Sequence, residues 1–76
     1  MKDIVQSVDR TLSILEVLSD YDDGLGVADI SAKLDLHKST VHRLLSTLII
    51  KGYVEQNSEN SRYKITLKLF ELGSKR

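Results

Sequence analysis

The sequence predicts a mainly α-helical domain with a small β-hairpin (α+β class), arranged as a winged helix-turn-helix. Two helical patterns lie between residues 28 and 51, and only the turn of residues 35–37 separates them. Over residues 53–65 the period changes to an alternation of apolar and polar side chains, which is typical of a β-hairpin. With an apolar helix before these elements and a short helix after them, the order is helix, helix, helix, hairpin, helix.

Length and composition indicate one small soluble domain. The chain has 76 residues, and a chain of this length buries only about 60% of its unfolded surface. Hydrophobic residues at 41% and charged residues at 29% are ordinary for a globular protein. The absence of Cys excludes disulfides and Cys-based zinc sites. No apolar run is long enough to span a membrane and the N-terminus lacks a signal peptide's apolar core, so we expect a cytoplasmic protein.

Charge is distributed unevenly along the chain, although the formal net charge is zero. Residues 1–36 hold three Lys or Arg against eight Asp or Glu, whereas residues 37–76 hold eight against three. The basic half also contains both histidines. A polyanion such as DNA would therefore dock on the second half.

The first helix is expected to run from an N-cap at Ser7 to about Ser19. Its apolar positions, with the small polar residues beside them, cover roughly 220° of the helix, which is wider than the stripe that one core contact requires. One side is expected to face the domain core. The edge that carries Ile14 and Val17 either meets another subunit or is covered by the C-terminal segment.

The second and third helices form the predicted helix-turn-helix. The second is expected from about Ala28 to Leu34, with Leu36 as an apolar plug in the turn, and residues 25–27 could add one rung to a small sheet. The third, called the reading helix, covers residues 38–51 and ends at Gly52, a residue typical of helix C-termini. One side of this helix is an apolar stripe that is expected to be buried. The opposite side carries Ser and Thr hydroxyls and longer hydrogen-bond donors, and it has no carboxylate.

A β-hairpin is expected from two short segments rich in β-formers, residues 53–57 and 62–65, joined by a polar connection. One face of the second segment is apolar and the other carries Arg62 and Lys64. Tyr53 and Tyr63 are interpreted as packing residues of the hairpin rather than as stacking platforms for bases. The remaining residues are compatible with a final helix that stops at Gly73.

Other functional classes find little support in the sequence. There is no Cys nucleophile or Gly-rich phosphate loop, and His37 and His42 are spaced poorly for sharing one metal ion, so we expect no enzyme, no metal and no cofactor. The stronger alternative is a winged-helix module that binds another protein. Such a module would need an exposed apolar patch on the reading helix, and Ile50 is the only candidate there.

The chain resembles the N-terminal DNA-binding domain of the IclR family of bacterial transcription regulators. Five separated blocks in the family's order and spacing carry the resemblance: Ser7-Val8-Asp9-Arg10 with Leu12, Ile14 and Leu15; Lys38 to Leu45; Gly52-Tyr53-Val54; Arg62-Tyr63; and Leu69 to Gly73. Two positions depart from the family pattern. His37 stands where Pro or a small residue is usual, and Ser61 stands where Gly is usual, so we expect Asn60 to take the left-handed conformation at the hairpin turn.

The resemblance implies domain boundaries and partners. It implies a helix-turn-helix at about residues 27–46, a wing at about 53–65 and the start of a linker helix at about 66–76. It also implies a C-terminal domain, absent from this chain, that binds a small-molecule effector, so that the chain would be a fragment of a longer regulator. The expected partners are double-stranded operator DNA, approximately palindromic, and a second copy of the chain that forms a homodimer through the first helix, at Ile14 and Val17.

The predicted chemistry is recognition of bases and phosphates. Residues near the N-terminus of the reading helix reach deepest into a major groove, so Arg43 is expected to contact guanine O6 and N7. Lys38 and Ser39 suit phosphates, and Thr40 and His42 suit either bases or phosphates. Arg62 is expected at the minor groove or backbone and Lys64 at the backbone. The predicted DNA-binding residues are Lys38, Ser39, Thr40, His42, Arg43, Thr47, Arg62 and Lys64.

Overall fold

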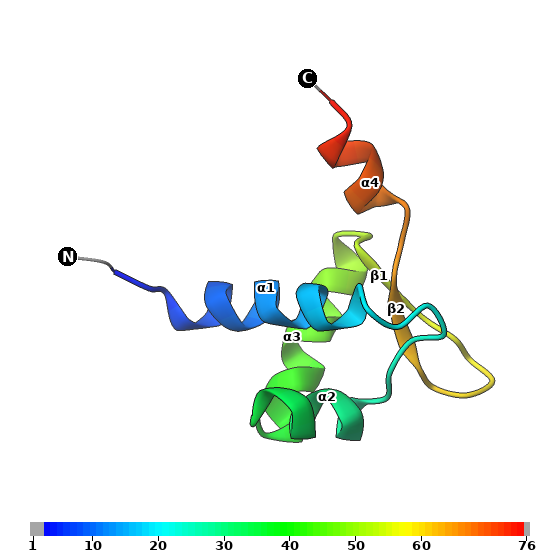
Figure 1. Ribbon diagram of the computed structural model, residues 1–76. Coiled ribbons are helices and arrows are strands. Elements are labelled where there is room, and N and C mark those ends of the chain that lie inside the picture. The colour runs from blue at the N-terminus through cyan, green and yellow to red at the C-terminus, as the bar shows by residue number, and fades with distance from the viewer. Residues whose placement is uncertain (1–2, 76) are drawn as a thin grey trace.

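The computed structural model describes residues 3–75 and has the predicted fold class and element order (Figure 1). The main elements are three helices and a two-stranded antiparallel hairpin, with a short fourth helix at the end. Within the described residues, no helix is both long and apolar enough to cross a membrane. The elements are α1 (Gln6–Leu18), α2 (Val27–Leu34), α3 (Lys38–Ile50), β1 (Val54–Gln56), β2 (Tyr63–Ile65) and α4 (Lys68–Gly73).

The start of α1 differs from the expectation. Its N-cap is Val5, and Ser7 lies inside the first turn, where its carbonyl accepts a hydrogen bond from Thr11 Oγ1 at 2.6 Å. The Ser7 hydroxyl therefore does not cap the helix. Propensity favoured Ser7 as the cap, but the helix begins one residue before it, at Gln6.

Local hydrogen bonds fix both the start of α2 and the turn between α2 and α3. Asp29 accepts a bond from the Gly26 N–H at 3.2 Å, which anchors the start of α2. Asp35 adopts a left-handed conformation (φ 55°) after the end of α2, and the Leu36 N–H then bonds to the Ser31 carbonyl at 3.1 Å. Leu36 is half-buried against the core, as expected for an apolar plug.

A Schellman motif ends α3. Gly52 has φ +86°, its N–H bonds to the Ile49 carbonyl at 2.9 Å, and the Tyr53 N–H bonds to the Leu48 carbonyl at 2.9 Å. These two bonds satisfy carbonyls that the helix end would otherwise leave unpaired. The predicted role of Gly52 is confirmed, and it sets the direction in which the chain enters β1.

The hairpin pairs β1 with β2 in the register Val54↔Ile65, Glu55↔Lys64 and Gln56↔Tyr63. The expected extra rung is present, because Leu25 and Tyr63 exchange two backbone hydrogen bonds of 2.9 and 2.8 Å. The expectation for the turn was wrong: Ser61, not Asn60, has the left-handed conformation (φ 62°). Asn60 instead uses its side-chain Oδ1 to accept a bond from the Arg62 N–H at 2.9 Å, which is a side-chain role that a φ-based argument does not foresee.

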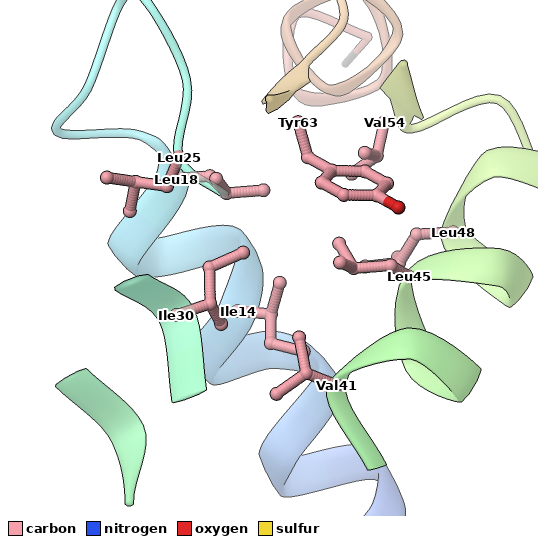
Figure 2. Packing of buried hydrophobic residues seen from close by; sticks show 9 residues of the cluster. All are labelled: Ile14, Leu18, Leu25, Ile30, Val41, Leu45, Leu48, Val54 and Tyr63. Carbon is pink, nitrogen blue, oxygen red and sulfur yellow. The ribbon is translucent and has the colours of Figure 1, made fainter. Parts of the chain in front are cut away.

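The hydrophobic core lies where α1, α2, α3 and the hairpin meet (Figure 2). In Figure 2, Ile14 lies near Ile30 and Val41, while the Tyr63 ring lies between the hairpin and Leu45. Tyr63 is thus a core residue, as expected. The buried hydrophobic residues are Ile14, Leu18, Leu25, Ile30, Val41, Leu45, Leu48, Val54 and Tyr63.

The last helix, α4, extends away from the end of the domain that holds α2 (Figure 1). All six of its residues are described, and none is buried. Leu67, just before α4, and Phe70 within it are largely exposed. Apolar packing therefore contributes little to holding α4 in place.

Candidate nucleic-acid interface

The exposed side of α3 presents a continuous row of hydrogen-bond donors. Lys38, Ser39, His42, Arg43 and Ser46 are all exposed. Their spacing of i, i+1, i+4, i+5 and i+8 places them along one side of the helix, opposite the buried Val41, Leu45 and Leu48. The sequence has no Asp or Glu between Leu36 and Val54. This side can therefore approach a polyanion without repulsion from its own helix.

The N-terminus of α3 is open to an anion. Its N-cap residue is His37, and within the described structure no side chain caps this helix end. The N–H groups of a first helical turn lack intrahelical acceptors and carry the positive end of the helix dipole. A phosphate oxygen would complete this end of the helix, next to Lys38 and Ser39.

Two of the predicted residues lie at the edges of this row. Thr40 is only half-exposed. Thr47 is exposed, but it lines a hollow of about 300 Å³ between α3 and α1, together with Leu44, Val8 and Leu12. Its hydroxyl also donates a long 3.4 Å bond to the Arg43 carbonyl. Thr47 thus borders α1 rather than the centre of the donor row.

Arg62 lies beside an acidic loop. It lines a hollow of about 510 Å³ with carboxylates from the α1–α2 connection and from α2, and with Lys33. The neighbouring Tyr21 raises the pKa of Lys33, through a side-chain hydrogen bond first and its charge second. The Leu25–Tyr63 bridge holds this loop against the base of the hairpin. The acidic side chains of the hollow are Asp20, Asp22, Asp23 and Asp29.

Lys64 also has an acidic neighbour. It is paired in register with Glu55 on β1, and both line the hollow between the hairpin, the end of α1 and α4. Asp22 and Tyr21 line this hollow as well. Both basic side chains of the hairpin are exposed, as predicted. Each also lies near carboxylates that the sequence pattern did not predict.

The residues predicted for a subunit interface were misplaced. Ile14 is 0% exposed in the domain's own core, and Val17 is partly buried against that core. The broad apolar arc of α1 is real, but α2 and α3 cover the Ile14 edge of it. Val8 and Leu12 are the exposed apolar residues, at 55% and 52%. The sequence defined the arc, whereas only the packing of α2 and α3 decides which edge remains uncovered.

A signal for this exposed edge was present in the sequence. Val8 and Leu12 are four residues apart, so they lie on one side of α1. Ile4 and Val5, which precede the helix, are also largely exposed. These four residues are the exposed large apolar residues in α1 and in the described segment before it.

Comparison with known proteins identifies close relatives. The model of the IclR helix-turn-helix domain matches residues 7–58. The HTH-type transcriptional regulator XynR of Escherichia coli K12 is 46% identical over 70 residues, which cover 92% of this chain and 28% of XynR. The HTH-type transcriptional regulator KdgR of Dickeya chrysanthemi is 42% identical over 73 residues, which cover 96% of this chain and 24% of KdgR.

A solved structure shows the same arrangement. The crystal structure of an IclR family transcriptional regulator from Brucella abortus matches with a TM-score of 0.85 and 31% identity, over 96% of this chain and 28% of that chain. The chain thus spans 24–28% of the length of these relatives. The relatives are named as transcription regulators, not as enzymes.

Proposed function

The chain belongs to the IclR family of bacterial transcription regulators, as a helix-turn-helix DNA-binding domain, and we propose that it reads operator DNA with α3 in the major groove. The family match favours this function over a winged-helix module for protein binding. The observation that carries the proposal is the donor row of Lys38, Ser39, His42, Arg43 and Ser46 on the exposed side of α3.

Within this row, position along the helix assigns the contacts. Arg43 donates to guanine O6 and N7, because its guanidinium offers paired donors that match these two acceptors. Lys38, Ser39 and the first N–H groups of α3 hold a phosphate, which fixes the register of the helix on the duplex. His42 and Thr40 contact neighbouring bases or phosphates. Thr47, near α1, contacts the backbone at the edge of the groove.

The hairpin acts as the wing. Arg62 and Lys64 contribute to backbone or minor-groove contacts, and the carboxylates beside them weaken this contribution. The wing therefore adds less affinity than two isolated cations would. Its role is mainly to orient the domain, because contacts to phosphates position a protein without reading sequence.

A second copy of the chain would pair through the exposed edge of α1. Val8 and Leu12 border an apolar hollow that Leu44 of α3 completes, and Ile4 and Val5 extend the apolar surface. A two-fold axis beside α1 would bury both copies of this surface at once. Such a homodimer would present two α3 helices to successive major grooves, so the operator would be approximately palindromic.

The relatives extend well beyond the part that matches this chain. Because the matched residues make up only 28% and 24% of these two relatives, we propose that the regulator also carries a C-terminal domain that binds a small-molecule effector, with residues 66–76 starting the linker. The helix-turn-helix at about residues 27–46 and the wing at about 53–65 would form the DNA-binding part.

A salt titration tests the proposed function. Fluorescence anisotropy would follow binding of the chain to a labelled duplex of mixed sequence at about 50 and 200 mM salt. With about three phosphate contacts, from Lys38, Arg62 and Lys64, affinity should fall roughly 40-fold between these conditions. An affinity that does not change with salt, or no binding at the lower salt, would rule out a DNA-binding surface.

A further inference from the structure

A set of polar contacts joins the start of α4 to the C-terminal turn of α3. The Lys68 ammonium donates a 2.6 Å hydrogen bond to the Lys51 carbonyl, and it lies 4.8 Å from the centre of the Tyr53 ring. Thr66 Oγ1 donates to the Gly52 carbonyl at 2.7 Å. We call this set of contacts the α4 latch: Thr66 and Lys68 on one side, and Lys51, Gly52 and Tyr53 on the other.

Each contact of the latch has a physical reason. A cation at the C-terminus of a helix interacts favourably with the negative end of the helix dipole, and the carbonyl at that end needs a donor. Gly52 is required by its backbone conformation (φ +86°) rather than by Lys68, because a Cβ there would make only an ordinary 3.5 Å contact with Lys68 Cδ. Backbone contacts complete the latch: the Thr66 N–H bonds to the Tyr53 carbonyl at 3.0 Å, and the Lys68 N–H bonds to Thr66 Oγ1 at 3.2 Å.

The opposite side of α4 offers little support. It faces a hollow of about 600 Å³ that Leu18, Tyr21, Leu67 and Phe70 help to line. Phe70 is 73% exposed, and α4, described in full, has no buried residue. With little apolar packing and open space on one side, the orientation of α4 depends on the latch.

We propose that Thr66 and Lys68 are positioning residues that make α4 and the C-terminal turn of α3 one rigid unit. A displacement of α4 then shifts α3, which changes the affinity for DNA. This coupling rests on the proposed function of α3. The latch predicts two separate effects: loosening of α4 when the latch is removed, and a change in DNA binding when a latch residue loses its hydrogen bonds without any change in charge.

Distance measurements between spin labels test the first effect. The chain has no Cys, so Ser46→Cys and Ser74→Cys provide defined labelling sites on α3 and after α4. Lys68→Met keeps the aliphatic stem but loses the donors, and it should broaden the distance distribution. Lys68→Arg, which still donates to a carbonyl and stacks on an aromatic ring, should keep it narrow. Lys75→Met is the control for charge. Equal widths for Lys68→Met and Lys75→Met would overturn the latch.

DNA binding tests the second effect. Thr66→Val removes the hydroxyl without changing charge, and it should lower the affinity about twofold to 30-fold, the range typical of coupling residues. The salt dependence should stay the same, because no phosphate contact is lost. Thr66→Ser keeps the hydroxyl and should bind as the original chain does. Unchanged affinity of Thr66→Val would overturn the coupling. An original chain that binds no duplex would instead refute the proposed function, while the label distances would still decide whether the latch holds α4.

Discussion

At the scale of single residues, the proposed DNA contacts of α3 are of two kinds, which differ in their position along the helix. Lys38 lies at the helix start beside N–H groups that no side chain caps in the described structure, which is a setting for a phosphate. Arg43 lies one and a half turns later in the middle of the donor row, which is a setting for base edges. The same helix can therefore supply sequence-independent affinity and sequence preference from different positions.

Replacing Lys38 tests the phosphate role. Lys38→Ala should weaken binding to every duplex by a similar factor and flatten the salt slope by about one unit, because one fewer counterion is released. Titrations at several salt concentrations measure both effects. Lys75→Ala, beyond α4, provides the control for charge and should leave the slope closer to its original value. A loss confined to one sequence would assign Lys38 to base readout instead.

Gly24 illustrates how one residue determines a local connection. It has φ +84°, and a Cβ there would lie 2.5 Å from the Tyr63 carbonyl oxygen, which accepts the Leu25 N–H. Gly24→Ala should therefore destabilise the domain by more than about 1 kcal/mol, as alanine does at a positive φ. Urea denaturation measures the change. The control Gly73→Ala, in a helix with open space around its Cα, should be neutral or stabilising. Equal stability of both variants would contradict the role of Gly24.

At the scale of elements, the sequence predicted most boundaries to within one or two residues. Helical and alternating periods reflect which side chains face the core, and those periods were clear in α3 and β2. The errors have a common cause. The N-cap of α1, the left-handed residue of the wing turn and the exposed edge of α1 depend on neighbours that are distant in the sequence or on competing local hydrogen bonds, and a single-sequence pattern contains neither.

The candidate site was predictable to a similar degree. The donor row of α3 follows from helical period, and four of its five residues were among the predicted DNA-binding residues. Ser46 was missed, although it is exposed on the same side of the helix. The acidic surroundings of Arg62 and Lys64 could not, because they depend on how the α1–α2 loop and β1 pack beside β2. The α4 latch was also not foreseen, since Lys68 and Lys51 lie 17 residues apart.

Removal of the two wing cations tests the contribution of the hairpin. The double variant Arg62→Ala/Lys64→Ala should bind DNA more weakly, while its thermal stability should change little, because exposed substitutions usually stay within about 0.5 kcal/mol. Thermal melting and anisotropy on the same samples separate the two effects. A large drop in melting temperature would show that these side chains support the fold rather than bind DNA.

At the scale of the whole molecule, an acidic loop and the donor row of α3 lie on different parts of the domain. The acidic α1–α2 loop adjoins the wing, whereas the donor row of α3 comes from a segment without carboxylates. The exposed apolar edge of α1 belongs to the side where α1 and Thr47 of α3 form a common hollow. A dimer through that edge would bring the two donor rows into one assembly.

Charged substitutions on α1 test this dimer. Leu12→Asp should weaken self-association without unfolding the domain, because Leu12 is half-exposed. Sedimentation equilibrium, with and without DNA, measures association. Ile50→Asp, at an exposed apolar position that does not line the hollow beside α1, is the matched control. Ile14→Asp is unsuitable, since a charge in the core would unfold the chain. If Leu12→Asp and Ile50→Asp associated to the same degree as the original chain, the α1 edge would not be the interface.

The most direct test of sequence reading by α3 is the specificity ratio of Arg43→Ala. Duplexes that the original chain selects from a random pool would be titrated beside scrambled duplexes of the same length and composition. If Arg43 contacts a guanine, Arg43→Ala should lose roughly 1–3 kcal/mol of binding to the selected duplex and become tolerant of all bases at one position of each half-site. Its binding to scrambled duplexes should change much less. Unchanged affinity and unchanged base preference in Arg43→Ala would contradict the assignment of α3 as the reading helix.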